Sequence, residues 1–397
     1  MGSLGAIAAT VRQDASTALL VLVLGSLAYS CVALLRVALF RLPEKPDGTF
    51  TPPVTLLKPV CGLEPEPALF DCLRSFCEQD YPSYQIVFGV RNSDDPAIPV
   101  IERLMRELPH LDATLVVDGR IYGANRKLSN LTNMFGAARH DIVISADADG
   151  QVGPGYLRSV VAPFANPRVG AVTCLYVGRP LGGMWSSLGA AFMSDWILPS
   201  VLIALAINKL SFLFGNTMAV RRDVLEEIGG FRGLTTFLAD DYLLGRRVSE
   251  RGFEVRLASC VVETVVSEPS LGPLFRHELR WGRTFRTVQP VGWVLSIVTD
   301  TTMLALLFLL ESGFGSLAAG LFGAAIVLRF GLHALVRRRF GITGPDRFWL
   351  VPVRDLLSFA VRIVSFFGRS LVWKNEQFVV VSAGRIEAKE GAPDSWS

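Results

Sequence analysis

The chain has 397 residues, of which 50% are hydrophobic, and a formal net charge of +3. With a mean hydropathy of +0.40 it is too apolar for an ordinary soluble protein, so part of it is expected in a membrane. The small net charge argues against nucleic-acid binding. The six cysteines form no CxxC pair and no zinc-ligand spacing, which predicts reduced thiols on the cytosolic side.

An uninterrupted apolar run covers residues 17–35. It is long enough to span a bilayer, which takes roughly 20 residues. A signal peptide is the alternative, but the run is followed by Arg36 and Arg41 and lacks a clear small-residue cleavage site. The sequence therefore predicts an uncleaved transmembrane anchor within residues 1–41.

Two further apolar runs, residues 291–310 and 313–335, are separated by a very short turn. They predict a transmembrane helical hairpin over 291–335. Three arginines at 337–339 follow directly, and the positive-inside rule keeps them in the cytosol. The middle region, 42–290, is then cytosolic as well.

The region 336–397 contains an apolar segment, residues 351–373, that carries polar side chains at helical spacing. This pattern predicts a helix that lies in the membrane interface or packs its polar stripe against protein. The tail after Ala383 is polar and is expected to be loosely ordered. The stripe consists of Arg354, Asp355, Ser358, Arg362, Ser365 and Arg369.

A second apolar segment, residues 183–213, lies inside the middle region and contains Trp185 and Trp196. It either dips into the membrane interface and admits a lipid, or forms a buried core helix. The sequence leaves both interpretations open.

The rest of the middle region has an α/β pattern. Strand-like runs at 54–57, 85–90, 114–117 and 141–145 alternate with helix-like runs, which predicts a largely parallel sheet. In open sheets of this kind, ligands bind beyond the carboxyl ends of the strands. Pairs of aspartates occur at such positions or before a helix: Asp94-Asp95, Asp147 with Asp149, and Asp240-Asp241.

The Asp147-Ala148-Asp149 triplet is the strongest single motif. In an extended segment one intervening residue leaves both carboxylates on the same face. They can then hold Mg²⁺ or Mn²⁺ while diphosphate oxygens complete the coordination shell. The alternative is a solvated turn, because this spacing also occurs by chance.

The other two aspartate pairs each have a structural alternative. Asp94-Asp95 either contact a nucleotide base or ribose, or form a turn with Pro96, which local sequence favours. Asp240-Asp241 either begin a helix, where negative charge is favourable, or supply a general base that removes a proton from an acceptor hydroxyl. Two neighbouring acids tend to raise one pKa, which suits a base.

Arg280-Trp281 completes the set of motifs. Arginine offers paired hydrogen bonds to phosphate, and tryptophan offers a flat face to a sugar or a lipid headgroup. A juxtamembrane anchor is the alternative, and the nearby Arg276, Arg283 and Arg286 favour it.

The order of these motifs resembles that of the ceramide glucosyltransferase family and of the similar bacterial hopanoid-associated glycosyltransferases. The resemblance covers residues 51 to 281, with membrane segments at both ends. The motifs are Leu56-Leu57-Lys58-Pro59, Gly62-Leu63-Glu64, Gln79-Asp80-Tyr81-Pro82, Asp94-Asp95-Pro96-Ala97, Gly123-Ala124-Asn125, Lys127, Asn130-Leu131, Asp147 with Asp149, Asp241 and Arg280-Trp281.

The resemblance implies a GT-A fold, a mixed and mostly parallel sheet flanked by helices, together with a UDP-sugar donor, a divalent metal (Mg²⁺ or Mn²⁺) and inversion at the anomeric carbon. It implies that Asp241 is the catalytic base and that Asp149, with Asp147, binds metal and diphosphate. The donor site would also include Lys58, Asp94, Asp95 and Lys127. Arg280 and Trp281 would close over the diphosphate and the acceptor channel, next to His277, where many members carry Gln or Arg.

The expected function is therefore transfer of glucose from a UDP-sugar to the hydroxyl of ceramide, by an integral protein of a bacterial inner membrane with a cytosolic catalytic domain. The first alternative is transfer of N-acetylglucosamine to a hopanoid, bacteriohopanetetrol. A processive polysaccharide synthase, a polyprenyl-phosphate glycosyltransferase, and a non-catalytic scaffold or transporter subunit are the remaining alternatives.

Overall fold

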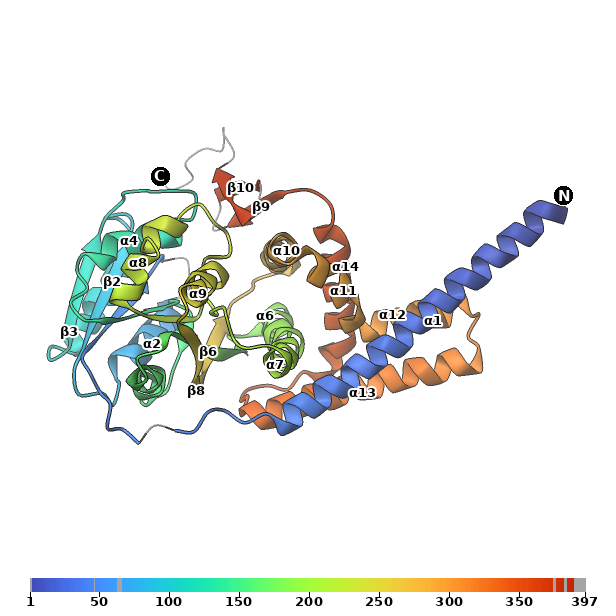
Figure 1. The fold of residues 1–397 in the computed structure, drawn as a ribbon, viewed down its shortest axis with the longest axis horizontal. Coiled ribbons are helices and arrows are strands. Elements are labelled where there is room, and N and C mark those ends of the chain that lie inside the picture. The colour runs from blue at the N-terminus through green and yellow to red at the C-terminus, as the bar shows by residue number, and fades with distance from the viewer. Residues whose placement is uncertain (1, 46, 63–65, 374–375, 382–383, 389–397) are drawn as a thin grey trace. The chain divides into compact units, whose positions relative to one another are not determined.

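The computed structural model describes residues 2–45, 47–62, 66–373, 376–381 and 384–388 (Figure 1). The chain divides into two compact units. The helical unit contains the described residues up to Phe40, then Ala191–Ile207 and Trp281–Gly368. The sheet unit contains Arg41–Ala190, Asn208–Arg280 and the described residues from Arg369 onward. Each unit therefore combines stretches that are far apart in sequence.

The large sheet of the sheet unit is mixed and mostly parallel, as the sequence predicted. Its strands lie in the order β3-β2-β1-β4-β7-β6-β8-β5. The first four in this order are parallel, β7 is antiparallel to both β4 and β6, and β8 is parallel to β6. The strands are β1 (Val54–Pro59), β2 (Tyr84–Val90), β3 (Asp112–Val117), β4 (Ile142–Ala146), β5 (Gly150–Gln151), β6 (Val169–Pro180), β7 (Thr217–Arg221) and β8 (Glu254–Val266).

Helices cover both faces of this sheet. Because side chains alternate along a strand, Leu56 packs toward one face and Leu57 toward the other. The first face is covered by α2 (Glu66–Cys77), α3 (Ala97–Glu107) and α5 (Tyr156–Val161). The second is covered by α4 (Arg126–Phe135), α8 (Arg222–Glu227) and α9 (Asp240–Glu250), of which α4 and α8 lie opposite α2 in Figure 1. Burial on both faces explains why the strands have nearly continuous apolar sequences.

A small antiparallel sheet belongs to the same unit and is formed by the C-terminal part of the chain. Its strands are β9 (Ser370–Trp373), β10 (Glu376–Val380) and β11 (Ile386–Ala388). The expectation of loose order after Ala383 is therefore wrong for residues 384–388, and residues 389–397 lie outside the described part. The helix expected over 351–373 ends earlier, at Ser365, because the chain then enters β9.

The helical unit contains helices that are long and apolar enough to cross a membrane. In the described part of the chain, three helical segments pass this test: Gln13–Leu39, Gly183–Ile207 and Ser316–Phe340. They mark the chain as a membrane protein. The helical elements that lie wholly or partly in this unit are α1 (Gly2–Leu39), α6 (Gly183–Ala191), π-helical η2 (Phe192–Ile197), α7 (Leu198–Ile207), α10 (Leu271–Val288), α11 (Pro290–Leu295), η4 (Ser296–Thr299), α12 (Thr301–Glu311), α13 (Ser316–Phe340), η5 (Phe348–Leu350) and α14 (Val351–Ser365).

The first span of the expected hairpin is broken. Pro290–Thr299 and Thr301–Glu311 meet at an angle of 65°, so the apolar run counts as one span only if this bent pair crosses the membrane together. The break occurs at Asp300, which is 4% exposed and pairs with the Arg362 guanidinium. Arg362 also donates to the Trp293 carbonyl (3.1 Å) and the Ser296 carbonyl (3.1 Å), which lie at the end of the first half. A buried arginine thus adds hydrogen bonds to two carbonyl groups before the break, which also accept from the Ser296 and Thr299 hydroxyls.

Helix α14 packs its polar stripe against protein, one of the two alternatives expected. Arg354, Asp355, Ser358, Arg362 and Ser365 are all buried. The Asp355 carboxylate pairs with the Arg329 guanidinium of α13 at 2.7 Å. The apolar face of α14 carries exposed side chains, among them Leu356, which is 54% exposed.

Candidate active site

The centre of the candidate site is an ion pair at the end of β4. The Lys127 ammonium lies 2.6 Å from Asp147 Oδ1. Lys127 is the second residue of α4, which begins after Asn125, whose side-chain oxygen accepts a hydrogen bond from the Leu128 amide (3.1 Å). An asparagine at this position satisfies one of the free amides of the first helical turn. The helix start therefore fixes where the lysine reaches the strand end.

The Asp240-Asp241 pair begins α9 and joins this cluster. Asp240 is only 8% exposed, and Asp241 is half-buried. A Cβ atom added to Gly215 would lie 3.4 Å from Asp241 Oδ2 and 3.8 Å from Asp147 Oδ2. The absence of a side chain at Gly215 therefore leaves room between these two carboxylates. The sequence analysis assigned no role to this glycine.

The charges of the cluster act on one another. Burial raises the pKa of Asp241 to about 7, and the charge of Asp240 adds to the effect. Burial also raises the pKa of Asp240, while Lys127 opposes the rise. For Lys127, burial opposes the charged form, but the carboxylates of Asp147 and Asp240 outweigh it and raise the pKa. A permanent cation thus lies beside a carboxyl group that titrates near neutral pH.

Arg280 belongs to the same electrostatic environment. Burial lowers the pKa of Arg280 to about 10, against the attraction of Asp240, Asp147 and Asp241. His277, three residues earlier on α10, hydrogen-bonds through Nδ1 to Glu268 Oε1 at 2.9 Å. Trp281 belongs to the helical unit, where its ring lies 5.8 Å from that of Phe192. The sequence motif thus combines an arginine of the sheet unit with a tryptophan of the helical unit.

Lys58 supports the turn that follows β4. It is fully buried, donates to the Asp147 carbonyl, and its ammonium lies 3.5 Å from the centre of the Phe76 ring. Burial lowers the pKa of Lys58 to about 8. These contacts position the backbone of Asp147, and a part for Lys58 in donor binding stays a prediction.

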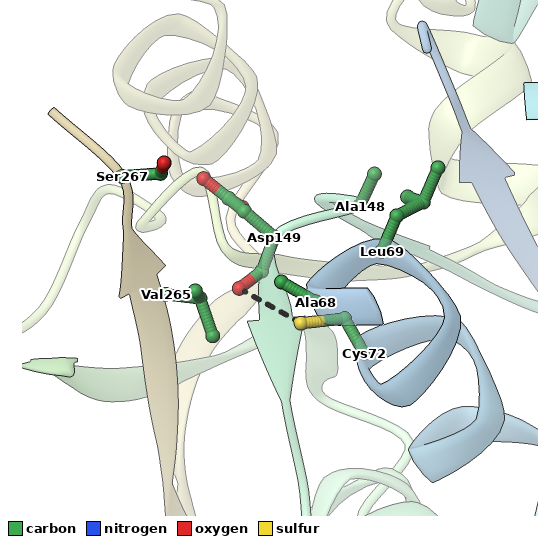
Figure 2. Close-up of a pocket in the computed structure, with 7 residues that line it drawn as sticks. All are labelled: Ala68, Leu69, Cys72, Ala148, Asp149, Val265 and Ser267. Atoms are coloured by element: carbon green, nitrogen blue, oxygen red, sulfur yellow. Dashed lines mark hydrogen bonds between the residues drawn. The ribbon is translucent and has the colours of Figure 1, made fainter. Parts of the chain in front are cut away.

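The Asp147-Ala148-Asp149 triplet is a turn, so the expectation of an extended segment is wrong. The Gly150 amide donates to the Asp147 carbonyl at 3.3 Å. The Asp149 carbonyl accepts from the Val265 amide at 2.9 Å and from the Cys72 thiol at 3.6 Å. In Figure 2 the Asp149 carboxylate points toward Ser267, and its carbonyl points toward Cys72. The small pocket shown there is lined by Ala68, Leu69, Cys72, Ala148, Asp149, Val265 and Ser267.

The two aspartates therefore have different surroundings. Asp147 faces Lys127, whereas Asp149 lines the pocket beside α2. Across the described residues, no group of three or more histidine, cysteine, aspartate or glutamate side chains is arranged to hold a metal ion. A magnesium ion in a phosphate-transferring site takes only one or two protein carboxylates, with the substrate's phosphates and water as its other ligands.

Asp94 and Asp95 form the turn that local sequence favoured. Asp95 Oδ1 accepts hydrogen bonds from the Gly62 amide (3.0 Å) and the Ala97 amide (2.9 Å), and Asp94 is exposed. The Gly62 contact requires a glycine, because a Cβ there would lie 2.5 Å from Pro96 Cγ. These contacts join the loop after β1 to the start of α3, and contact with a nucleotide stays a prediction.

The mixed, mostly parallel sheet with helices on both faces is a fold of the GT-A type. A solved mannosyltransferase from Pyrobaculum calidifontis, in complex with GDP-Man and Mn²⁺, matches with a TM-score of 0.51 and 20% sequence identity. The match covers 90% of this chain and 99% of that structure. It supports the expected fold.

The sequence profile of glycosyl transferase family 21 matches residues 18–386, and the chain belongs to this family. The resemblance inferred from the motifs is thus confirmed, and the protein is an enzyme of the glycosyltransferase class.

Ceramide glucosyltransferases are among its relatives. Ceramide glucosyltransferase 1 of Caenorhabditis elegans is 23% identical over 376 residues, which are 89% of this chain and 78% of that protein. Ceramide glucosyltransferase 3 of the same organism is 26% identical over 247 residues, or 61% and 52% of the two chains. The ceramide glucosyltransferase of Komagataella phaffii is 39% identical over 114 residues, or 28% and 22%.

Proposed function

We propose that the protein is a membrane-bound, inverting glycosyltransferase that moves glucose from UDP-glucose to the primary hydroxyl of ceramide. The observation that carries the proposal is the buried cluster in which Asp241, with a pKa of about 7, lies in the field of Lys127 and Asp147. A carboxyl group that titrates near the working pH suits a general base. Family membership and the ceramide glucosyltransferases among the relatives support the reaction class and the acceptor.

In the proposed reaction the acceptor oxygen attacks the anomeric carbon from the face opposite the diphosphate. The bond between that carbon and the diphosphate oxygen breaks, and UDP leaves with the electron pair. Asp241 takes the proton of the acceptor hydroxyl. A single displacement inverts the anomeric carbon and needs no carboxylate nucleophile, unlike a retaining mechanism.

The residues of the cluster have distinct parts in this proposal. Lys127 and Arg280 are cations that interact electrostatically with the aspartates of the cluster. They would stabilise the negative charge that grows on the departing diphosphate. Lys58 holds the turn, while Asp94 and Asp95 lie on the side of the uridine. A part for His277 and for Trp281 in acceptor binding rests on the sequence resemblance.

A divalent metal fits the donor groups of this site. The Asp147 carboxylate is 32% exposed, and Asp240 Oδ2 is buried without a hydrogen bond, so oxygen ligands and negative charge are both present. Asp147 would hold Mg²⁺ or Mn²⁺ together with the diphosphate, and a part for Asp149 as a second ligand rests on the sequence motif. The bound ion would neutralise charge on the leaving group.

The proposed orientation places the sheet unit on the cytosolic side of a bacterial inner membrane. The carboxyl ends of α1 and α13 lie together, since the rings of Phe40 and Phe340 stack at 6.1 Å. Arginines 337–339 lie in the last turn of α13, and Arg36 in that of α1. Both basic ends are therefore on one side, which the positive-inside rule assigns to the cytosol. The layout of anchor (1–41), catalytic domain (42–290), hairpin (291–335) and C-terminal region (336–397) is part of this proposal.

The test crosses four donors with two acceptors. Purified protein in detergent with Mn²⁺ is given UDP-glucose, UDP-N-acetylglucosamine, UDP-galactose or UDP-glucuronate, with ceramide or bacteriohopanetetrol, and the glycolipid is identified by mass spectrometry. We expect glucosylceramide. A hopanoid product would overturn the acceptor assignment, and a different sugar on ceramide would overturn the donor assignment. The absence of both product and nucleotide binding would contradict a transferase function.

A further inference from the structure

We propose that the small C-terminal sheet, β9–β11, is a positioning element of the active site, and that Glu376 is its principal positioning residue. This inference rests on the proposed function, because it concerns the placement of Asp241 and Lys127 for the same transfer. Of its strands, β11 lies in the segment that the sequence pattern presented as a polar tail, and β9 lies in the segment that was expected to be helical.

The first observation is a backbone connection to the loop that precedes the proposed base. The Ile386 amide donates to the Thr236 carbonyl at 2.8 Å, and the Leu238 amide donates to the Gly384 carbonyl at 3.0 Å. Between them, Phe237 and Arg385 form an antiparallel bridge. Residues 236–238 thus pair with the C-terminal segment, only three positions before Asp241.

The second observation is a shared apolar core. Leu238 is 5% exposed and packs in a cluster with side chains of all three strands of the small sheet. Ala124, which lies just before α4, packs against the same cluster. The cluster consists of Leu238, Leu371, Phe378, Val380 and Ile386. The small sheet therefore supports both the loop before α9 and the loop before α4.

The third observation is the position of Glu376. Its carboxylate accepts hydrogen bonds from Arg126 Nε (2.8 Å) and Arg91 Nη1 (3.1 Å), and the side chain is 16% exposed. Arg126 is adjacent to Lys127, the cation that pairs with Asp147. The second arginine, Arg91, directly follows β2. Glu376 thus connects the start of α4 to the carboxyl end of β2.

The loops before α4 and α9 are also joined directly. Asn125 is fully buried, and its side-chain Nδ2 donates to the Phe237 carbonyl (3.0 Å). Its backbone amide donates to the Thr235 carbonyl (2.7 Å). A displacement of one loop is therefore transmitted to the other. Since catalysis falls by about 100-fold for a misplacement of roughly 1 Å, a support that holds both Lys127 and Asp241 is expected to act on turnover.

The experiment compares Glu376→Gln with Glu387→Gln in the full-length protein in detergent. Glu387 lies on β11, is exposed, and carries the same charge, so it is a matched control. We expect Glu376→Gln to lower kcat by about 10-fold while the KM for the donor changes by less than about twofold, and Glu387→Gln to leave both unchanged. An equal loss in the two variants, or an unchanged kcat in Glu376→Gln, would overturn the proposal.

Two further measurements separate a positioning role of Glu376 from a folding defect and from an error in the assigned reaction. In a double-mutant cycle of Arg126→Gln and Glu376→Gln, the combined loss of activity should be smaller than the sum of the two single losses; strictly additive losses would contradict a specific ion pair. Hydrogen exchange of the segment 235–243, followed by mass spectrometry, should be faster in Glu376→Gln than in the wild type. This readout needs no substrate, so it tests the support even if the proposed donor and acceptor are wrong, and unchanged exchange would overturn the inference.

Discussion

Each unit of the molecule contains a buried ionic cluster, and the two clusters differ in how completely their charges are satisfied. In the helical unit, Arg362 pairs with Asp300, and Arg329 pairs with Asp355, so each carboxylate has its own guanidinium. In the sheet unit, two cations, Lys127 and Arg280, share three carboxylates, those of Asp147, Asp240 and Asp241. The pairs in the helical unit stabilise the helix break at Asp300 and hold the buried polar side chains of α14 in place. The cluster in the sheet unit leaves a carboxyl group with a pKa of about 7, as expected of a group that exchanges protons during catalysis.

The largest expected effect comes from removing the proposed base. Asp241→Asn should lower turnover by about 10²- to 10⁴-fold, because the amide cannot accept the acceptor's proton. Binding of the UDP-sugar, measured by calorimetry, should stay close to that of the wild type. Asp223→Asn is the control, since Asp223 is an exposed acid in the first turn of α8 and should tolerate the change. Substantial turnover by Asp241→Asn would refute the assignment of the base.

Chelation tests whether the proposed active site needs a divalent cation for activity. EDTA should reduce glycolipid formation by roughly 100-fold or more, because the departing diphosphate would lose its main source of neutralisation. Added Mn²⁺ or Mg²⁺ should restore the rate, as followed by mass spectrometry of the product. A rate indifferent to EDTA would remove the metal from the proposal.

Breaking the satisfied cluster should affect stability. Arg362→Leu leaves Asp300 buried without its cation, and this should cost about 3–5 kcal/mol of unfolding free energy. The double variant Arg362→Leu with Asp300→Leu should recover much of the loss, because both charges are then removed. Thermal unfolding in detergent measures both. Equal stability of Arg362→Leu and wild type would mean that this pair does not fix the helix break.

The smallest effect concerns pH. Since the pKa of Asp241 is raised to about 7, kcat/KM should fall progressively as the pH decreases below 7. Loss of the fold does not explain this fall. Protonation of a group whose pKa is higher in the folded state than its ordinary 3.8 favours folding between those two values. The melting temperature should therefore show no parallel drop from this group between pH 7 and 5. A flat rate profile over this range would contradict the raised pKa.

The sequence predicted those parts of the molecule that depend on local pattern. The alternation of strands and helices up to β4 gave the parallel half of the sheet, and Asp240-Asp241 correctly indicated the start of α9. The antiparallel placement of β7 was not predictable in this way, since Thr217–Arg221 follows β4 without the regular strand–helix alternation and was not among the strand-like runs. Likewise, the ion pair between Lys127 and Asp147 joins residues whose spacing has no local signal.

Two features that the sequence pattern did not reveal have a similar physical cause. The apolar run around Asp300 looks continuous, because the arginine that stabilises its break lies 62 residues later in the sequence. Residues 384–388 look like a polar tail, because their hydrogen-bond partners are the backbone groups of Thr236 and Leu238. In both places the structure depends on partners far away in the sequence, and hydrophobic periodicity does not reveal such partners.

The C-terminal position of the small sheet has a consequence for biosynthesis. The ribosome delivers Thr236 and Leu238 before the apolar helices of residues 281–368, and their partners Gly384 and Ile386 come after those helices. Because domains generally fold during synthesis as their segments appear, the loop before Asp241 lacks its partners while the helical unit is being translated. A nascent chain that ends before residue 384 lacks part of the support for the proposed base, Asp241. Because β11 leaves the ribosome after these helices, completion of the proposed catalytic cluster is tied to synthesis of the membrane helices.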